Sequence, residues 1–356
     1  MVILIDGSFG EGGGQILRTS LALSALTLKP VKIVNIRAKR SNPGLRPQHL
    51  TAVKVIATLT DAEVKGAYVG SMELEFHPKT RRGGRFQFDI GTAGSISLVL
   101  QAAIPTMLYA NEPVELTIRG GTDVSWSPPI DYMRYVFTHW LGLMGAKISI
   151  KVLRRGHYPR GGGLVKVRVE PVTKLKALNV LERGEVISIH GISHAVKLPK
   201  HVAVRQAKSA KDYLVDKGFD ESKISIDLEF YEPSRDPHLG PGSGIVLWAR
   251  TTNNCILGAD SLGARGKPAE RVGREAAEKL YEELLSNAAL DSHMGDMIIP
   301  FLALAHGNSE VTISKLTMHT YTNIEIVKRI LGAEVTYEGE LNSKSTIKVK
   351  GLAFTG

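Results

Sequence analysis

The chain of 356 residues is poor in cysteine and has no long apolar stretch. Its single cysteine, Cys255, excludes a disulfide framework and any zinc site built from several cysteines. No apolar run reaches the roughly 18 residues of a membrane span, and no amino-terminal signal pattern is present. The sequence therefore predicts a cytoplasmic protein without a membrane partner.

Charged residues are also scarce, at 22% against 43% hydrophobic residues, so the chain can bury a large core and extensive disorder is excluded. Acidic residues are fewer than basic ones: the chain has 35 Asp and Glu and 45 Lys and Arg, which gives a net charge of +10. This surplus favours an anionic partner, although a merely solvated basic surface has the same composition.

One pattern recurs three times along the chain: an apolar helix, a strand, a loop, an amphipathic helix and another strand. The strands before the amphipathic helices fall at 31–37, 114–120 and 311–317. If the three units pack with pseudo-threefold symmetry, the loops after these strands converge. Those loops carry Arg40 and Gln48 in the first unit, Asp123 and Trp126 in the second, and His319 in the third.

A segment between the second and third copies does not follow the pattern and has strands and helices of its own. We therefore predict an α/β (α+β) protein in which residues 1–184 form repeats one and two of a large domain. Residues 185–288 form a small inserted α/β domain, and residues 289–356 complete the large domain as the third repeat.

The amino-terminal segment has a short strand, a glycine turn at Gly10–Gly14 and a helix that carries Arg18 in its second turn. Glycines before a helix allow backbone amides to approach a phosphate, and Arg18 adds charge. Neither standard nucleotide-binding loop is complete, so a simple tight turn is the competing interpretation. Glu11 within the turn is best explained by a divalent cation shared with a phosphate.

Residues 35–50 concentrate basic side chains, including Arg40, around a Pro-Gly turn and suit a polyanion, although a solvated basic loop is equally compatible. Gln101 interrupts an apolar helix and needs a partner, either internal or a ligand. His319 stands at a predicted helix start. There a cationic ring is disfavoured, so we expect a neutral, nucleophilic histidine, with a loop histidine bonded to backbone as the alternative.

Seven segments together resemble the RNA 3'-terminal phosphate cyclase family over essentially the whole chain. They are GEGGGQILR, the RxxxxxPGLRxQH segment, GSISLVLQAAIP, RGGTDV, PRGGG, AxxxGARGKPAERVG and KLTMHTYTNI. The resemblance implies a large domain of three βαβαββ-type units, akin to the carboxy-terminal domain of a bacterial translation initiation factor and to enolpyruvyl transferases, plus a small inserted domain.

It also implies a ligase reaction with ATP as co-substrate. A histidine attacks the α-phosphorus of ATP, AMP passes to an RNA 3'-phosphate, and the neighbouring 2'-hydroxyl displaces AMP to give a 2',3'-cyclic phosphate. The implied partners are thus ATP, an RNA with a 3'-terminal phosphate, and Mg²⁺ or Mn²⁺. The oligomeric state is left open, a homo-oligomer included.

The family's functional positions match residue by residue. His319 matches the adenylated nucleophile and Glu11 a metal ligand. Arg18, Arg40 and Gln48 match phosphate-contacting positions, and the ATP-binding set is Arg18, Gln101, Pro128, His293, Asp296 and Met297, with adenine expected between Pro128 and His293.

Two other functions share this architecture. Cyclase-like factors in rRNA processing lack the nucleophile, and enolpyruvyl transferases do not need the histidine loop. Retention of His319, Glu11 and Arg18 favours the enzyme. Because the basic loop at 37–46 has no aromatic side chain, the sequence predicts that RNA is held mainly through its terminal phosphate and backbone.

Overall fold

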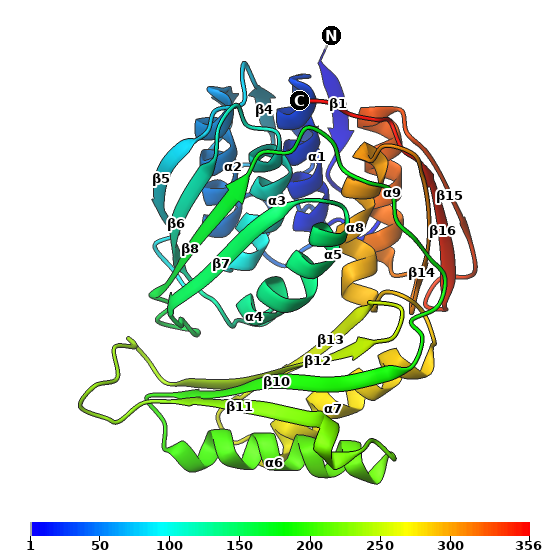
Figure 1. The fold of residues 1–356 in the computed structure, drawn as a ribbon. Helices are drawn as coiled ribbons and strands as arrows, with labels where there is room; N and C mark the ends of the chain where they lie inside the picture. The colour runs from blue at the N-terminus through cyan, green and yellow to red at the C-terminus, as the bar shows by residue number, and fades with distance from the viewer. Residues whose placement is uncertain (1) are drawn as a thin grey trace.

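The computed structural model describes residues 2–356 and consists of a large part and a smaller α/β part beneath it (Figure 1). Three units make up the large part. The first comprises β1 (Ile3–Asp6), α1 (Gly14–Thr27), β2 (Val31–Val34), α2 (Pro47–Thr60), β3 (Glu63–Lys65) and β4 (Leu74–His77). The second comprises β5 (Gly84–Asp89), α3 (Ile96–Leu108), β6 (Val114–Gly120), α4 (Ile130–Tyr132), the π-helical η1 (Met133–Phe137), α5 (Thr138–Leu143), β7 (Lys147–Arg154) and β8 (Gly163–Glu170). The third comprises β9 (Asn179–Val180), α8 (Ser292–Leu304), β14 (Asn308–Ile313), α9 (Met318–Leu331), β15 (Glu334–Glu338) and β16 (Ser345–Lys350).

The three units share one sheet topology, which confirms the predicted repeat. The strand orders are β1-β2-β4-β3, β5-β6-β8-β7 and β9-β14-β16-β15. In each sheet the first two strands are parallel and the remaining pairs are antiparallel.

One strand lies in a different unit from the one the sequence suggested. We placed everything up to residue 184 in the first two repeats, but β9 pairs with β14 and belongs to the third sheet. The inserted segment therefore interrupts unit three between its first strand and its first helix. A two-residue strand carries no readable periodicity, so only its pairing identifies it.

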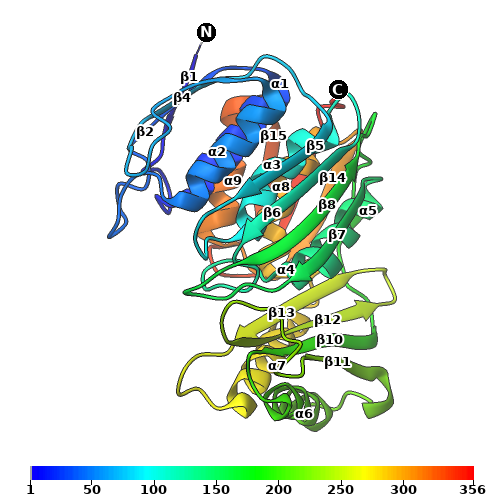
Figure 2. The same ribbon diagram turned by 90° about the vertical axis from the view of Figure 1, so that its left-hand side faces the viewer.

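The apolar helices lie in the centre of the large part, with the sheets outside them (Figures 1 and 2). Twelve of the thirteen residues of α3 are buried, the exception being Gln101, and in α8 only Ser292 and His293 are not buried. A helix that is apolar all round must be covered on every side, which these central positions provide. Helix α1 packs against both α3 and α9, so units one, two and three meet along it.

The smaller part has one sheet, β11-β10-β12-β13, with two helices on its lower face (Figure 1). Its elements are β10 (Val186–Val196), α6 (Lys200–Asp216), η2 (Glu221–Lys223), β11 (Ile224–Phe230), β12 (Gly242–Thr251), β13 (Ile256–Leu262) and α7 (Ala269–Leu285). Strand β13 was not predicted. It follows β12 after a turn at Asn253–Asn254, and turn residues there were its one sequence signal. The boundaries at 185 and 288 stay a prediction.

Two polar and aromatic clusters join the parts. The guanidinium of Arg155, which is 1% exposed, lies 3.2 Å from Asp123, 2.5 Å from Asp131 and 2.7 Å from Glu229 on β11. The rings of Tyr135 on η1 and Trp248 on β12 stack with centroids 4.3 Å apart. Side chains from both parts therefore fix the insert against the second unit.

None of the helices within residues 2–356 combines the length and apolar character that crossing a bilayer requires.

Candidate active site

The glycine turn between β1 and α1 is packed against two other segments. Gly10 has a φ of +55°, and a Cβ there would lie 2.4 Å from Oγ1 of Thr322 on α9. A Cβ on Gly14 would lie 2.4 Å from Nε2 of His49 and 2.9 Å from Nη1 of Arg18. Only glycine permits these approaches, so the turn is a close-packed junction of units one and three and not merely a reversal of the chain.

His319 meets Glu11 at this junction. It lies in the first turn of α9, behind the N-cap residue Thr317, whose side chain accepts a hydrogen bond from the amide of Thr320 at 3.0 Å. Nδ1 of His319 is 2.6 Å from Oε2 of Glu11, and the guanidinium of Arg40 pairs with the other oxygen. The loops of units one and three therefore converge on one carboxylate, as the repeat predicted.

The second unit takes part in a different way from the one predicted. Asp123 is buried and bonds to Thr122 and Arg155, and Trp126 is 98% exposed, so this loop does not add a side chain to the Glu11 cluster. Instead Gln48, in the first turn of α2, accepts a hydrogen bond at 3.0 Å from the amide of Ser95, the N-cap of α3. Unit two reaches the site through the start of α3.

The charges at the junction depend on one another. His319 and, next, Arg40 lower the pKa of Glu11 to about 2, against burial, which raises it. Burial lowers the pKa of His319, but the contact with Glu11 and the charge of Asp296 outweigh it, and the net pKa is raised. The expectation of a neutral ring is therefore not supported, because Glu11 and Asp296 both favour a proton on His319.

Arg18, Gln101 and Met297 line one small void between α1, α3 and α8, of about 30 Å³. The amide of Gln101 donates to Sδ of Met297 at 2.7 Å, so this glutamine in a buried helix has an internal partner. Burial lowers the pKa of Arg18 to about 10, which leaves its guanidinium charged at neutral pH. A buried cation beside the glycine turn is suited to an anionic ligand.

Asp296 fixes the start of α9. Its carboxylate accepts hydrogen bonds from the hydroxyls of Thr317 and Thr320, and its carbonyl accepts one from Asn323 at 2.7 Å. Asn323 also accepts a hydrogen bond from Thr19 on α1 at 2.7 Å. We did not predict these three α9 residues or Thr19 from the sequence. Their signal was the polar residues on the buried face of α9, which need partners.

His49 belongs to the segment 35–50 that the sequence suggested for a polyanion, but it was not among the predicted site residues. It is buried beside Gly14, its Nδ1 accepts a hydrogen bond from the amide of Arg46 at 3.2 Å, and burial, followed by the charges of Arg18, Arg37 and Arg46, lowers its pKa to about 3. A neutral ring adds no further positive charge next to Arg18, Arg37 and Arg46.

Pro128 and His293 lie on two segments that the structure joins. His293 is exposed at the start of α8, and its ring is edge-on to that of Tyr132 with centroids 6.1 Å apart. The hydroxyl of Tyr132 donates to Asp291, the N-cap of α8, at 2.7 Å. Pro128 is half-buried and precedes α4, which carries Tyr132. An adenine held between Pro128 and His293 stays a prediction.

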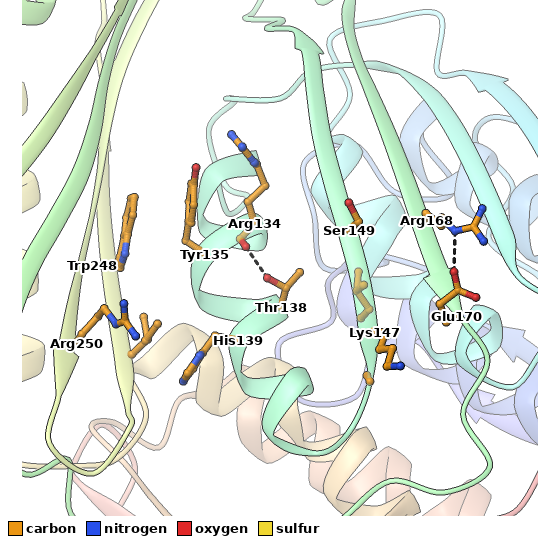
Figure 3. A pocket seen from close by; sticks show the side chains of 13 residues that line it. Arg134, Tyr135, Thr138, His139, Lys147, Ser149, Arg168, Glu170, Trp248 and Arg250 are labelled. Atoms are coloured by element: carbon orange, nitrogen blue, oxygen red, sulfur yellow. Dashed lines mark hydrogen bonds and ion pairs between the residues drawn. The ribbon is translucent and has the colours of Figure 1, made fainter.

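A separate cleft of about 550 Å³ lies between the second unit and the insert (Figure 3). The stacked Tyr135 and Trp248 form part of its wall, and Arg168 at its rim is paired with Glu170 at 2.7 Å. None of the predicted site residues lines this cleft. It therefore gives no support to a reaction centre at this interface.

Replacing Glu11 by glutamine is expected to lower the pKa of His319. The variant removes the negative charge that holds a proton on the ring, so the neutral, nucleophilic fraction of His319 at pH 7 should rise. An NMR titration of the His319 ring measures this directly, without any ligand. Glu75→Gln is the matched control because Glu75 contacts His77 and not His319. A His319 pKa that stays unchanged in Glu11→Gln contradicts the assigned coupling.

Known proteins resemble the chain along almost its whole length. The model for the family "RNA 3'-terminal phosphate cyclase" matches residues 9–337. The chain is 58% identical to the RNA 3'-terminal phosphate cyclase of Ignicoccus hospitalis over 99% of both chains, and 58% identical to that of Staphylothermus marinus over 99% of both. The protein of that name from Methanopyrus kandleri is 51% identical over 98% of this chain and 99% of its own. EPSP synthase from Acinetobacter baumannii matches with a TM-score of 0.29 and 14% identity over 99% of this chain and 64% of that one, too weakly to bear on the fold. The chain belongs to the RNA 3'-terminal phosphate cyclase family.

Proposed function

We propose that this protein converts an RNA 3'-terminal phosphate to a 2',3'-cyclic phosphodiester, with ATP as the energy source and His319 as the covalent nucleophile. The observation that carries the proposal is His319 at the start of α9, held by Glu11 at the junction of units one and three. In a member of this family, that placement of an accessible imidazole near the buried cation of Arg18 and the exposed cation of Arg40 suits transfer of AMP.

Glu11 is the residue that positions the nucleophile. When the His319 ring is neutral, a proton on Nδ1 faces the Glu11 carboxylate, and Nε2 keeps its lone pair. Nε2 then forms a bond to the α-phosphorus of ATP as the bond from that phosphorus to the bridging oxygen breaks, and diphosphate leaves. A carboxylate that orients the imidazole through its other nitrogen has the same role in many histidine sites.

Two further displacements complete the reaction. An oxygen of the RNA 3'-phosphate attacks the phosphorus of the His319 adduct, so AMP moves to the RNA and the ring is restored. The neighbouring 2'-hydroxyl then attacks the RNA 3'-phosphorus, loses its proton, and displaces AMP. Activation by AMP replaces a poor leaving group with a good one, and the intramolecular geometry makes the last attack fast.

The cations around the turn have distinct roles in this scheme. Arg18 is buried, charged and close to Gly14, which suits the phosphates of ATP. Arg40 is exposed at its pairing with Glu11, and Gln48 lies at the meeting of α2 and α3, which suits the incoming RNA phosphate. Each of these side chains donates hydrogen bonds that are strongest to anionic oxygens.

A divalent cation fits this site in only one way. Glu11 is the carboxylate in contact with His319, and both of its oxygens already face cations, so the protein offers one acidic ligand and not a complete cage. Mg²⁺ and Mn²⁺ are often held by one carboxylate together with substrate phosphates and water. When bound there, the cation would offset the negative charge of the ATP phosphates.

The proposed ATP site combines Arg18, Gln101 and Met297 on the central helices with Pro128 and His293 at the adenine end. Asp296, whose carboxylate is taken up by Thr317 and Thr320, supports this site by fixing the first turn of α9.

The test is incubation of the protein with ATP labelled at the α-phosphate, followed by mass spectrometry of the adduct. We expect an acid-labile AMP adduct on His319, and its transfer to an RNA with a 3'-phosphate to give the cyclic product. A non-catalytic rRNA-processing factor would form no adduct, and an enolpyruvyl transferase would retain no label. An adduct on another residue contradicts the assignment.

A further inference from the structure

Trp126 is displayed to solvent in an unusual way. Of the three tryptophans, Trp140 and Trp248 are buried at 0% and 8% exposure, whereas Trp126 is 98% exposed. Its φ is +65°, a left-handed conformation that is uncommon for a bulky side chain. Backbone strain of this kind persists where the surrounding structure enforces it and is frequent at binding sites.

The backbone on both sides of Trp126 is fixed. The hydroxyl of Ser127 donates to the carbonyl of Val124 at 2.9 Å, and the amide of Ile130 donates to the carbonyl of Thr122 at 2.9 Å. The loop is therefore closed at its base and carries an internal turn. The indole is held outward by this loop and is not the tip of a long unsupported segment.

A second exposed aromatic residue lies on the adjoining loop. Asp123 and His157 form a parallel bridge, so the loop that carries Trp126 and the loop that carries Tyr158 adjoin at that point. Tyr158, next to that bridge, is 79% exposed. Arg160, two residues further on, is exposed and has no ion-pair partner within residues 2–356. Two exposed aromatic rings and a cation without an ion-pair partner among the described residues are thus carried by two adjoining loops, and we call this set the aromatic patch: Trp126, Tyr158 and Arg160.

The loop that carries Trp126 begins at the segment that contacts Gln48 of the candidate active site. The amide of Ile96 donates to the carbonyl of Gly121 at 2.9 Å, and the amide of Gly121 donates to Gly94 at 2.8 Å. The neighbouring amide, that of Ser95, donates to Gln48 at 3.0 Å. Trp126 follows Gly121 by five positions along the chain, so the two residues are at most about 18 Å apart.

The second loop of the patch meets the same segment. A Cβ on Gly161 would lie 2.8 Å from the Cα of Ala93, so this loop packs directly on the residues that precede α3. Both patch loops therefore rest on the segment that contacts Gln48.

We propose that the aromatic patch binds the single-stranded RNA that lies 5' of the reacting 3'-phosphate, with a base stacked on Trp126 and the backbone near Arg160. This inference rests on the proposed function, since Gln48 is assigned to the terminal phosphate. Exposed aromatic rings next to basic side chains are the usual means of holding single strands without reading their sequence. A chain of net charge +10 favours the same anionic partner.

The test compares RNAs of two and six nucleotides, both ending in a 3'-phosphate, on the full-length protein. In Trp126→Ala, the preference for the longer RNA over the shorter one should fall roughly 5- to 100-fold, the range for loss of one stacked base. Trp126→Phe, which keeps a flat ring, should lose much less. Leu285→Ala is the matched control because Leu285 is also exposed, at 65%, but lies at the end of α7.

Fluorescence gives a second measurement, which starts from the wild-type protein. Trp126 is the exposed tryptophan of the three, so its emission should be quenched by the six-nucleotide RNA in the wild-type protein, and this response should vanish in Trp126→Phe. Equal length preference in wild type and Trp126→Ala, with no quenching, would overturn the inference. So would emission that changes with protein concentration alone, which would identify the patch as a contact between copies.

The two proposals fail separately. If wild-type protein forms no cyclic product from either RNA, the proposed function is wrong, and the inference about the aromatic patch is wrong as well. If wild type cyclises both RNAs but Trp126→Ala keeps the same length preference, only the role of the aromatic patch is wrong.

Discussion

His319→Ala is expected to abolish the AMP adduct and to reduce overall cyclisation by at least roughly 10⁴-fold, as removal of a covalent nucleophile commonly does. The ring is half-buried in the first turn of α9 and contributes little core area, so the fold should persist. Glu11, which contacts His319, is a carboxylate and cannot replace an imidazole nitrogen in a stable adduct. Mass spectrometry after incubation with ATP measures the adduct, and circular dichroism checks the fold.

An RNA already adenylated at its 3'-phosphate makes this test sharper. The last displacement uses the 2'-hydroxyl of the RNA and no enzyme nucleophile, so the His319→Ala variant should still release AMP and cyclic product from this RNA. His77→Ala is the control, because His77 pairs with Glu75 on the first sheet. An AMP adduct on the His319→Ala protein would contradict the mechanism. So would normal cyclisation of an ordinary 3'-phosphate RNA by this variant in the presence of ATP while no adduct forms.

Arg155→Leu should lower the free energy of unfolding by about 3–5 kcal/mol, the largest loss of stability among the variants considered. The guanidinium is 1% exposed and balances three carboxylates, two of which, Asp123 and Asp131, are fully buried. Leucine fills much of the volume but leaves those charges without their partner. Denaturant unfolding measures the difference.

Arg85→Leu is the control for the loss of an arginine at a surface site. The Arg85 side chain is 85% exposed at its pair with Glu115, so its replacement should change stability by no more than about 1 kcal/mol. Adding Asp131→Asn to Arg155→Leu should recover part of the loss, because it removes one of the stranded charges. Similar stability for Arg155→Leu and Arg85→Leu would show that the buried cluster does not hold the insert in place.

The sequence was sufficient to predict the threefold repeat, because helices and strands each have a characteristic spacing of apolar residues along the chain. It was also sufficient to single out His319, Glu11, Arg18 and Gln101. Each is a polar or charged residue in a glycine turn, an apolar helix or a helix start, where such a side chain needs a partner. It missed β13 and placed β9 in the wrong unit, because a short strand is defined by what it pairs with.

The electrostatic coupling between Glu11 and His319 could not be predicted from the sequence either. Glu11 and His319 are more than three hundred residues apart, and only folding brings them to 2.6 Å, where the carboxylate raises the pKa of the ring. Asp123 was expected in the site by analogy between loops, yet Arg155 draws it into the domain junction.

What the amino-acid sequence determined by itself was the repeated architecture, the chemical types at the site and the family. The tertiary structure alone decided which of the three loops meet, the protonation preference of His319, and the exposure of Trp126 and Tyr158 on two adjoining loops. The physical reason is that periodicity and residue type are local properties of a chain, whereas proximity, burial and electrostatic coupling arise only between segments that folding brings together.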